Sequence, residues 1–166
     1  MTVEEREEAR RRLALDLLRE LRVVERLSEL GPVEITGAMR HHLVVDRDID
    51  VDVTVDELDA HGCFAAIGEI ASDPRVLRVV YRNEAETSGW LAFDLVCRDA
   101  EGERWTIGAI LAPKEALVGD ADYRSMDAYR AVVDDGIRDL DGFLRWRDVN
   151  GSEELAHWLP GSVPPA

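Results

Sequence analysis

Three aspartates alternate with aliphatic residues in the run Asp48–Val53, whose sequence is DIDVDV. Side chains of a β-strand point to opposite faces in turn, so Asp48, Asp50 and Asp52 share one face of the predicted strand. Neighbouring acids on that face lie roughly 6.5–7 Å apart, which is twice the rise per residue. Such carboxylates repel one another unless something neutralises them, and two of them can hold Mg²⁺ or Mn²⁺, which prefer oxygen ligands.

A glycine precedes this strand by eleven residues. Gly37 follows the strand-like run 33–36 (VEIT) and comes before a predicted short helix over 38–45. Glycine lets a phosphate approach the backbone closely, and the amide groups at the start of a helix favour an anion. A phosphate-binding turn next to a cation-binding strand would hold a metal–triphosphate complex.

The stretch ITGAMRHHLVVDRDIDVDV, residues 35–53, resembles the signature of the DNA polymerase beta-like nucleotidyltransferase superfamily. That signature is a hydrophobic residue, Gly, then Gly or Ser, and, after a gap of about ten residues, Asp-hydrophobic-Asp on the next strand. The match covers residues 33–55 directly, and the order of the flanking elements is compatible over about 30–115.

The resemblance implies transfer of a nucleoside monophosphate from an NTP to an acceptor, which is a small molecule or a protein. It also implies catalytic and metal-binding roles for Asp48 and Asp50, with Mg²⁺ or Mn²⁺ as the cofactor. Gly37 and Ala38 would then form the nucleotide-binding loop beside the triphosphate.

Two positions depart from the family pattern. Ala38 replaces the small hydroxyl residue, which removes one hydrogen bond to phosphate. Relatives with a similar layout often carry the third carboxylate in a Trp-x-hydrophobic-Asp strand, and RWTIGAI places Gly108 there. Asp94 interrupts the apolar run WLAFDLV, and we expect the following hairpin to bring it close to the face of Gly108 as a substitute catalytic acid. Asp52 is the other substitute.

These departures keep two other interpretations open. One is a catalytically lapsed protein of this fold that binds a nucleotide or a protein partner, which both Ala38 and Gly108 favour. The other is an ordinary α/β domain in which the acidic row is the solvated face of a half-exposed strand.

Composition restricts the partners. The formal net charge of −15 argues against a nucleic-acid partner, because phosphate-backbone contacts need a basic surface. No apolar run approaches the ~18 residues that a membrane span needs. Cys63 and Cys97 are far apart and form no CxxC motif, which favours reduced thiols in a cytoplasmic protein. Self-association through the first helix, as a homodimer, stays open.

Hydrophobic periodicity predicts an α/β (α+β) domain in which helices flank a mixed sheet of about five strands. A long helix should run from residue 2 to Gly31–Pro32, and a second from Asp56 to just before Pro74. Strands are predicted at 33–36, 49–55, 76–82, 89–98 and 103–112. We expect a core over 1–115, a helical segment over 116–160 and a disordered tail over 161–166.

Overall fold

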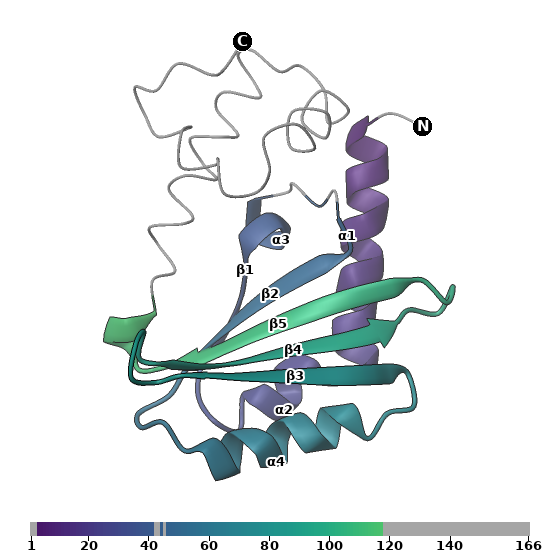
Figure 1. Cartoon of the computed structure of the whole chain (residues 1–166). Helices are drawn as coiled ribbons and strands as arrows, with labels where there is room; N and C mark the ends of the chain where they lie inside the picture. The colour runs from purple at the N-terminus through teal and green to yellow at the C-terminus, as the bar shows by residue number, and fades with distance from the viewer. Residues whose placement is uncertain (1–2, 42–43, 45, 118–166) are drawn as a thin grey trace, which may run out of the picture.

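A five-stranded mixed sheet forms the centre of the computed structural model, which describes residues 3–41, 44 and 46–117. The strand order is β1-β2-β5-β4-β3; β2 and β5 are parallel and all other neighbours are antiparallel (Figure 1). The prediction of an α+β fold with a mixed sheet is confirmed. The strands are β1 Val33–Thr36, β2 Asp48–Thr54, β3 Val76–Glu84, β4 Trp90–Arg98 and β5 Arg104–Ala112.

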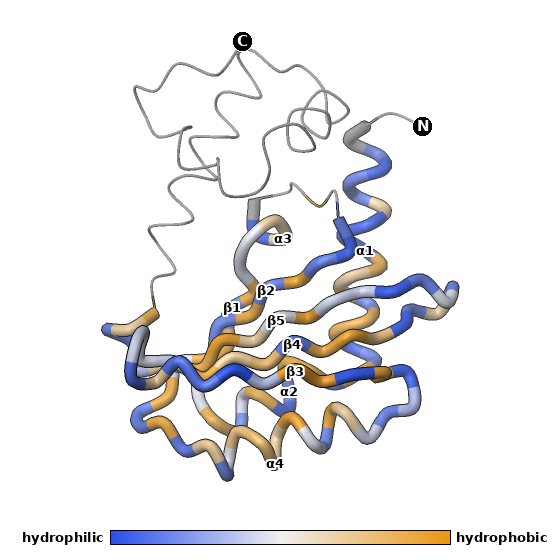
Figure 2. The backbone as a smooth tube through the Cα atoms, in the orientation of Figure 1, coloured by the Kyte–Doolittle hydropathy of each residue, from blue (hydrophilic) through white to orange (hydrophobic). Residues whose placement is uncertain are grey.

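One face of this sheet makes the hydrophobic core. Along β2, Ile49, Val51 and Val53 are fully buried, and the residues between them are the aspartates. Strands β4 and β5 follow a similar alternation over most of their length. Figure 2 shows mainly hydrophobic residues in the middle of these strands and hydrophilic residues near both hairpins. The period-two pattern in the sequence therefore separates a core face from a second face, here called the polar face, which carries the aspartates.

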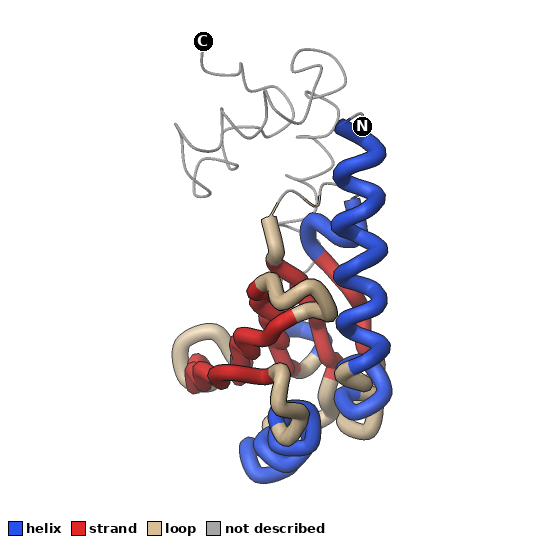
Figure 3. Tube along the Cα trace, turned by 90° about the vertical axis from the view of Figure 1, so that its right-hand side faces the viewer, coloured by secondary structure: helices blue, strands red, loops and turns tan. Residues whose placement is uncertain are grey.

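The helices bury their apolar residues on the core face. Leu17 of α1, Leu27 of α2 and Ile67 of α4 belong to one cluster with Ile49 and Phe93 of the sheet. Figure 3 shows α1 standing beside the strands and α4 at their lower edge. The helices are α1 Val3–Glu20, α2 Val23–Leu27, α3 Gly37–His41 and α4 Ala60–Ala71, and a 3₁₀ turn, η1, covers Lys114–Ala116.

The predicted N-terminal helix is interrupted. It ends at Glu20, and Arg22 adopts a left-handed conformation (φ 56°, ψ 34°) before α2 begins at Val23. The break redirects the chain so that both Leu17 and Leu27 reach the core. The sequence here has no glycine or proline, and only the β-branched pair Val23–Val24 weakens the helical pattern.

Helix α4 starts later than the sequence predicts. It begins at Ala60, with Asp59 in extended conformation at the N-cap position, instead of at Asp56. The residues from Asp56 to Asp59 belong to the connection between β2 and α4. The buried residues of α4 are Cys63, Ala66, Ile67 and Ile70.

Asp99 fixes the hairpin between β4 and β5. One of its carboxylate oxygens accepts hydrogen bonds from the backbone amides of Glu101 and Glu103, and the other accepts one from Nε1 of buried Trp105 at 2.8 Å. Burial raises the pKa of this carboxyl, but the hydrogen bonds together outweigh burial and hold the pKa below its ordinary value. The turn therefore locks the register in which β4 meets β5.

The predicted helical segment over 116–160 lies outside the described residues from residue 118 onward, as does the predicted tail over 161–166. Among the described helices, none is long and apolar enough to cross a membrane.

Candidate functional site

The strand registers bring four predicted or newly found residues into one row across the polar face. Thr36 of β1 lies opposite Asp50 of β2, Asp50 lies opposite Gly108 of β5, and Gly108 lies opposite Asp94 of β4. Directly opposed residues of neighbouring strands point to the same face. The two acids therefore stand on either side of a residue that has no side chain.

Gly108 leaves a small space that both carboxylates border. A methyl group at its Cα would lie 3.4 Å from Oδ1 of Asp94 and 3.5 Å from Oδ1 of Asp50. One oxygen of each carboxylate thus leans toward the same volume. The structure places Asp94 directly opposite Gly108, while Thr106 lies opposite Val96.

Gly37 lies against the second oxygen of the Asp50 carboxylate. Its φ of +61° lies in the left-handed region, where glycine carries no steric penalty. A methyl group on its Cα would overlap Oδ2 of Asp50 and lie 3.2 Å from its Cγ. Glycine at position 37 is therefore required both by the backbone conformation and by the packing of Asp50.

The turn that the sequence predicts as a nucleotide-binding loop leads into a short helix. The helix that follows Gly37 is the five-residue α3, so little helix dipole is available for a phosphate. Ala38 is packed against the hydrophobic core. A phosphate at this place would meet the backbone of the turn and not the side chain of Ala38.

Asp50 lies among the other acids of the polar face, with Asp48 and Asp52 along β2 and Asp94 on the far side of Gly108. Asp50 is exposed to solvent as a residue, although its carboxylate lies against the Gly37 turn. Partial removal from water, followed by repulsion from Asp48, Asp52 and Asp94, raises the pKa of Asp50 to about 6. A cation at this point would offset the repulsion among the carboxylates, because it stabilises their ionised forms.

Asp94 is also paired with a basic residue. Its Oδ2 lies 3.6 Å from Nη2 of Arg82 on β3, and both side chains are partly open to solvent. The two oxygens of Asp94 therefore serve different neighbours, one toward Gly108 and one toward Arg82. Such a solvent-exposed ion pair contributes little to stability.

Thr36 is a polar residue that sequence reasoning treated only as the end of a strand. Its side chain is completely buried, and its Oγ1 has no hydrogen-bond partner among the residues that the structure describes. It shares the row of Asp50 and comes immediately before Gly37. The signal in the sequence was a hydroxyl residue at the hydrophobic position that precedes the signature glycine.

The donor set fits a cation that brings ligands of its own. Within residues 3–41, 44 and 46–117, no group of three or more His, Cys, Asp and Glu side chains is arranged to hold a metal ion. Mg²⁺ is commonly bound by one or two carboxylates together with substrate phosphates and water. The carboxylates of Asp48 and Asp50 on one strand, with Asp94 across Gly108, would suit that mode of binding.

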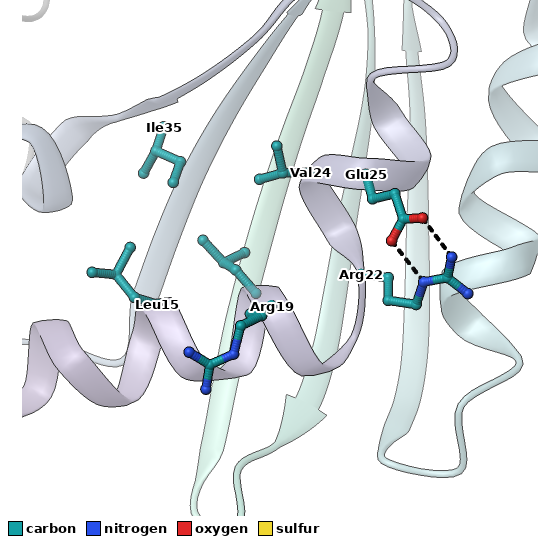
Figure 4. A pocket seen from close by; sticks show the side chains of 7 residues that line it. Leu15, Arg19, Arg22, Val24, Glu25 and Ile35 are labelled. Carbon is teal, nitrogen blue, oxygen red and sulfur yellow. Dashed lines mark hydrogen bonds and ion pairs between the residues drawn. The ribbon is translucent and has the colours of Figure 1, made fainter.

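A separate apolar pocket lies away from this site. Its volume is about 330 Å³, and it is bordered by α1, α2 and β1 (Figure 4). Ile35 lines it from the core side of β1, whereas Thr36 points to the polar face. The pocket is lined by Leu15, Leu18, Arg19, Arg22, Val24, Glu25 and Ile35.

Comparisons with known proteins assign this chain to no family. No protein-family model matches it, and no curated protein matches it. Among solved structures, the crystal structure of JHP933 from Helicobacter pylori is similar, with a TM-score of 0.37 and 13% sequence identity. That match covers 61% of this chain and 44% of the other, and at this level of likeness it carries no argument about function.

We expect Gly108→Ala to keep the fold and weaken cation binding. The added methyl group would make ordinary contacts of 3.4–3.5 Å with the two carboxylate oxygens, so the free energy of unfolding should change by less than about 1 kcal/mol. The methyl group fills the volume between Asp50 and Asp94, and the affinity for Mn²⁺ should fall about tenfold. Urea unfolding and Mn²⁺ titration measure the two effects. An unchanged Mn²⁺ affinity would show that no cation sits over Gly108.

Proposed function

We propose that the chain is a metal-dependent nucleotidyltransferase that moves a nucleoside monophosphate from an NTP to a hydroxyl acceptor. The observation that supports this most is the approach of Asp50 and Asp94, from different strands, to the space above Gly108. The left-handed turn at Gly37 adjoins Asp50, which supports a link between the predicted phosphate-binding turn and the acidic strand.

The reaction requires one bond to form and one to break. The acceptor oxygen attacks the α-phosphorus, and the bond from that phosphorus to the bridging oxygen of the β-phosphate breaks. Pyrophosphate leaves with the electron pair, and the hydroxyl proton passes to the Asp94 carboxylate. Asp48 and Asp50 would hold Mg²⁺, which supplies positive charge against the phosphate oxygens when bound.

The alternative proposal is a catalytically lapsed protein that binds a nucleotide or another protein. Two observations favour it: glycine occupies the place of the family's third acid, and Asp94 is paired with Arg82. Its nucleotide-binding form predicts that NTP binds without release of pyrophosphate.

The deciding experiment measures NTP binding and pyrophosphate release in parallel. The wild-type protein is incubated with Mg²⁺ or Mn²⁺ and ATP, GTP, CTP or UTP, while the thermal midpoint and released pyrophosphate are followed; a ligand that binds the native state raises the midpoint. Metal-dependent stabilisation with pyrophosphate release across a panel of hydroxyl acceptors supports the transferase. Stabilisation alone supports a lapsed protein that binds nucleotide. No response to any NTP contradicts both the transferase and the lapsed nucleotide-binding protein, and leaves the lapsed protein-binding form.

A further inference from the structure

Three arginines lie on the polar face near the hairpin between β4 and β5. Arg98 of β4 lies directly opposite Arg104 of β5. Arg78 of β3 lies opposite Val96, one same-face position from Arg98. All three residues are exposed, and together they are called the arginine cluster. A basic group of this kind is notable in a chain with a formal net charge of −15.

The charges of the arginine cluster are poorly neutralised by the rest of the described chain. Like charges directly opposite each other on neighbouring strands are destabilising. Arg98 donates a hydrogen bond from Nη1 to the carbonyl of Gly102, which is uncharged. The side chains of Arg78 and Arg104 make no hydrogen bond or ion pair with another described residue. The nearby acid Glu103 is paired with Arg47.

The arginine cluster lies next to the candidate site. A second row crosses the polar face in the order Asp48, Thr106, Val96 and Arg78, each residue lying opposite the next. This row lies two residues along the strands from the row of Gly108, which is roughly 7 Å. The pair Arg98–Arg104 lies four residues from Gly108, which is roughly 13 Å. A substrate seated over Gly108 is within reach of these long side chains.

We propose that the arginine cluster binds a phosphate group of a substrate, an inference that rests on the proposed nucleotidyl transfer. The planar guanidinium fork matches the oxygens of a phosphate and bonds it in pairs. An anion placed between Arg98 and Arg104 also removes their mutual repulsion. The phosphate belongs either to the triphosphate of the donor or to a phosphorylated acceptor.

Binding of inorganic pyrophosphate to the full chain in EDTA, at fixed ionic strength, tests the proposal without any metal. The wild type should bind pyrophosphate and rise in thermal midpoint, while Arg104→Gln and Arg78→Gln should each weaken binding about tenfold. Arg12→Gln is the matched control, because Arg12 is an exposed arginine paired with Glu8 on α1. Circular dichroism checks that each variant is folded.

A second arm separates the two sources of phosphate. If the arginine cluster holds the donor, pyrophosphate and Mg²⁺–NTP compete, and Arg104→Gln weakens NTP binding as well. If it holds an acceptor, inorganic phosphate binds together with Mg²⁺–NTP, and the variants leave NTP affinity unchanged. Either outcome supports the proposal.

The proposal is overturned if the wild type binds neither phosphate nor pyrophosphate, or if the cluster variants bind them as the control does. Its failure is distinct from failure of the proposed function. Asp50→Asn should lose the metal-dependent response to NTP and still bind pyrophosphate in EDTA, because Asp50 is not part of the arginine cluster.

Discussion

Asp50→Asn is expected to make the protein more stable at pH 7.5 and to abolish its response to metal and NTP. The pKa of Asp50 is raised to about 6 in the folded protein, above its ordinary value. As the pH rises from about 4 to 6, the unfolded chain gives up this proton first, so folded stability falls over that window and stays lower above it. Asparagine cannot ionise and avoids the loss.

The size of the gain is limited by solvent. Because Asp50 is exposed on one side, screening reduces the effect, and we expect about 1 kcal/mol at pH 7.5 and none near pH 3.5. Urea unfolding at the two pH values measures it. Pyrophosphate release should fall by on the order of 100-fold or more, because charge stabilisation by a metal ion is worth several kcal/mol.

Asp56→Asn is the matched control, since Asp56 is an exposed aspartate just beyond the end of β2. It should change neither stability nor activity. A variant Asp50→Asn that is less stable than the wild type at pH 7.5, or that differs from it equally at both pH values, would contradict the crowding of carboxylates around Asp50.

Local pattern was enough to predict most strands and the face on which the acids lie. The alternation of Asp48–Val53 fixes that face without any knowledge of neighbouring strands. It could not fix which strand lies beside β2, because its parallel partner β5 comes more than fifty residues later in the sequence. The position of Gly108 between Asp50 and Asp94 is a product of that long-range pairing.

Two other features were beyond the sequence because tertiary packing decides them. The left-handed residue Arg22 interrupts a helix whose local pattern is continuous, and the gain is burial of Leu27. The arginine cluster could not be seen either, because Arg78 meets Arg98 only through the register of β3 with β4. The roles of Asp48, Asp50 and Asp94 as catalytic residues stay predictions.

Gly37→Ala should damage both the stability of the protein and the candidate site. The left-handed backbone at φ +61° costs a residue with a Cβ about 1–2 kcal/mol, and the overlap with Oδ2 of Asp50 forces that side chain from its rotamer for about 1 kcal/mol more. We expect a loss of about 2–3 kcal/mol in the free energy of unfolding, together with loss of the metal and NTP response.

A double-mutant cycle separates backbone strain from the clash with Asp50. In an Asp50→Ala background the carboxylate is absent, so Gly37→Ala should cost only the backbone part, about 1–2 kcal/mol. Gly68→Ala supplies the opposite control: Gly68 lies within α4 with open space around its Cα, and alanine there should stabilise by up to about 1 kcal/mol. Equal costs of Gly37→Ala in both backgrounds would mean that Asp50 does not rest against the turn, and the link between the glycine turn and the carboxylate would be lost.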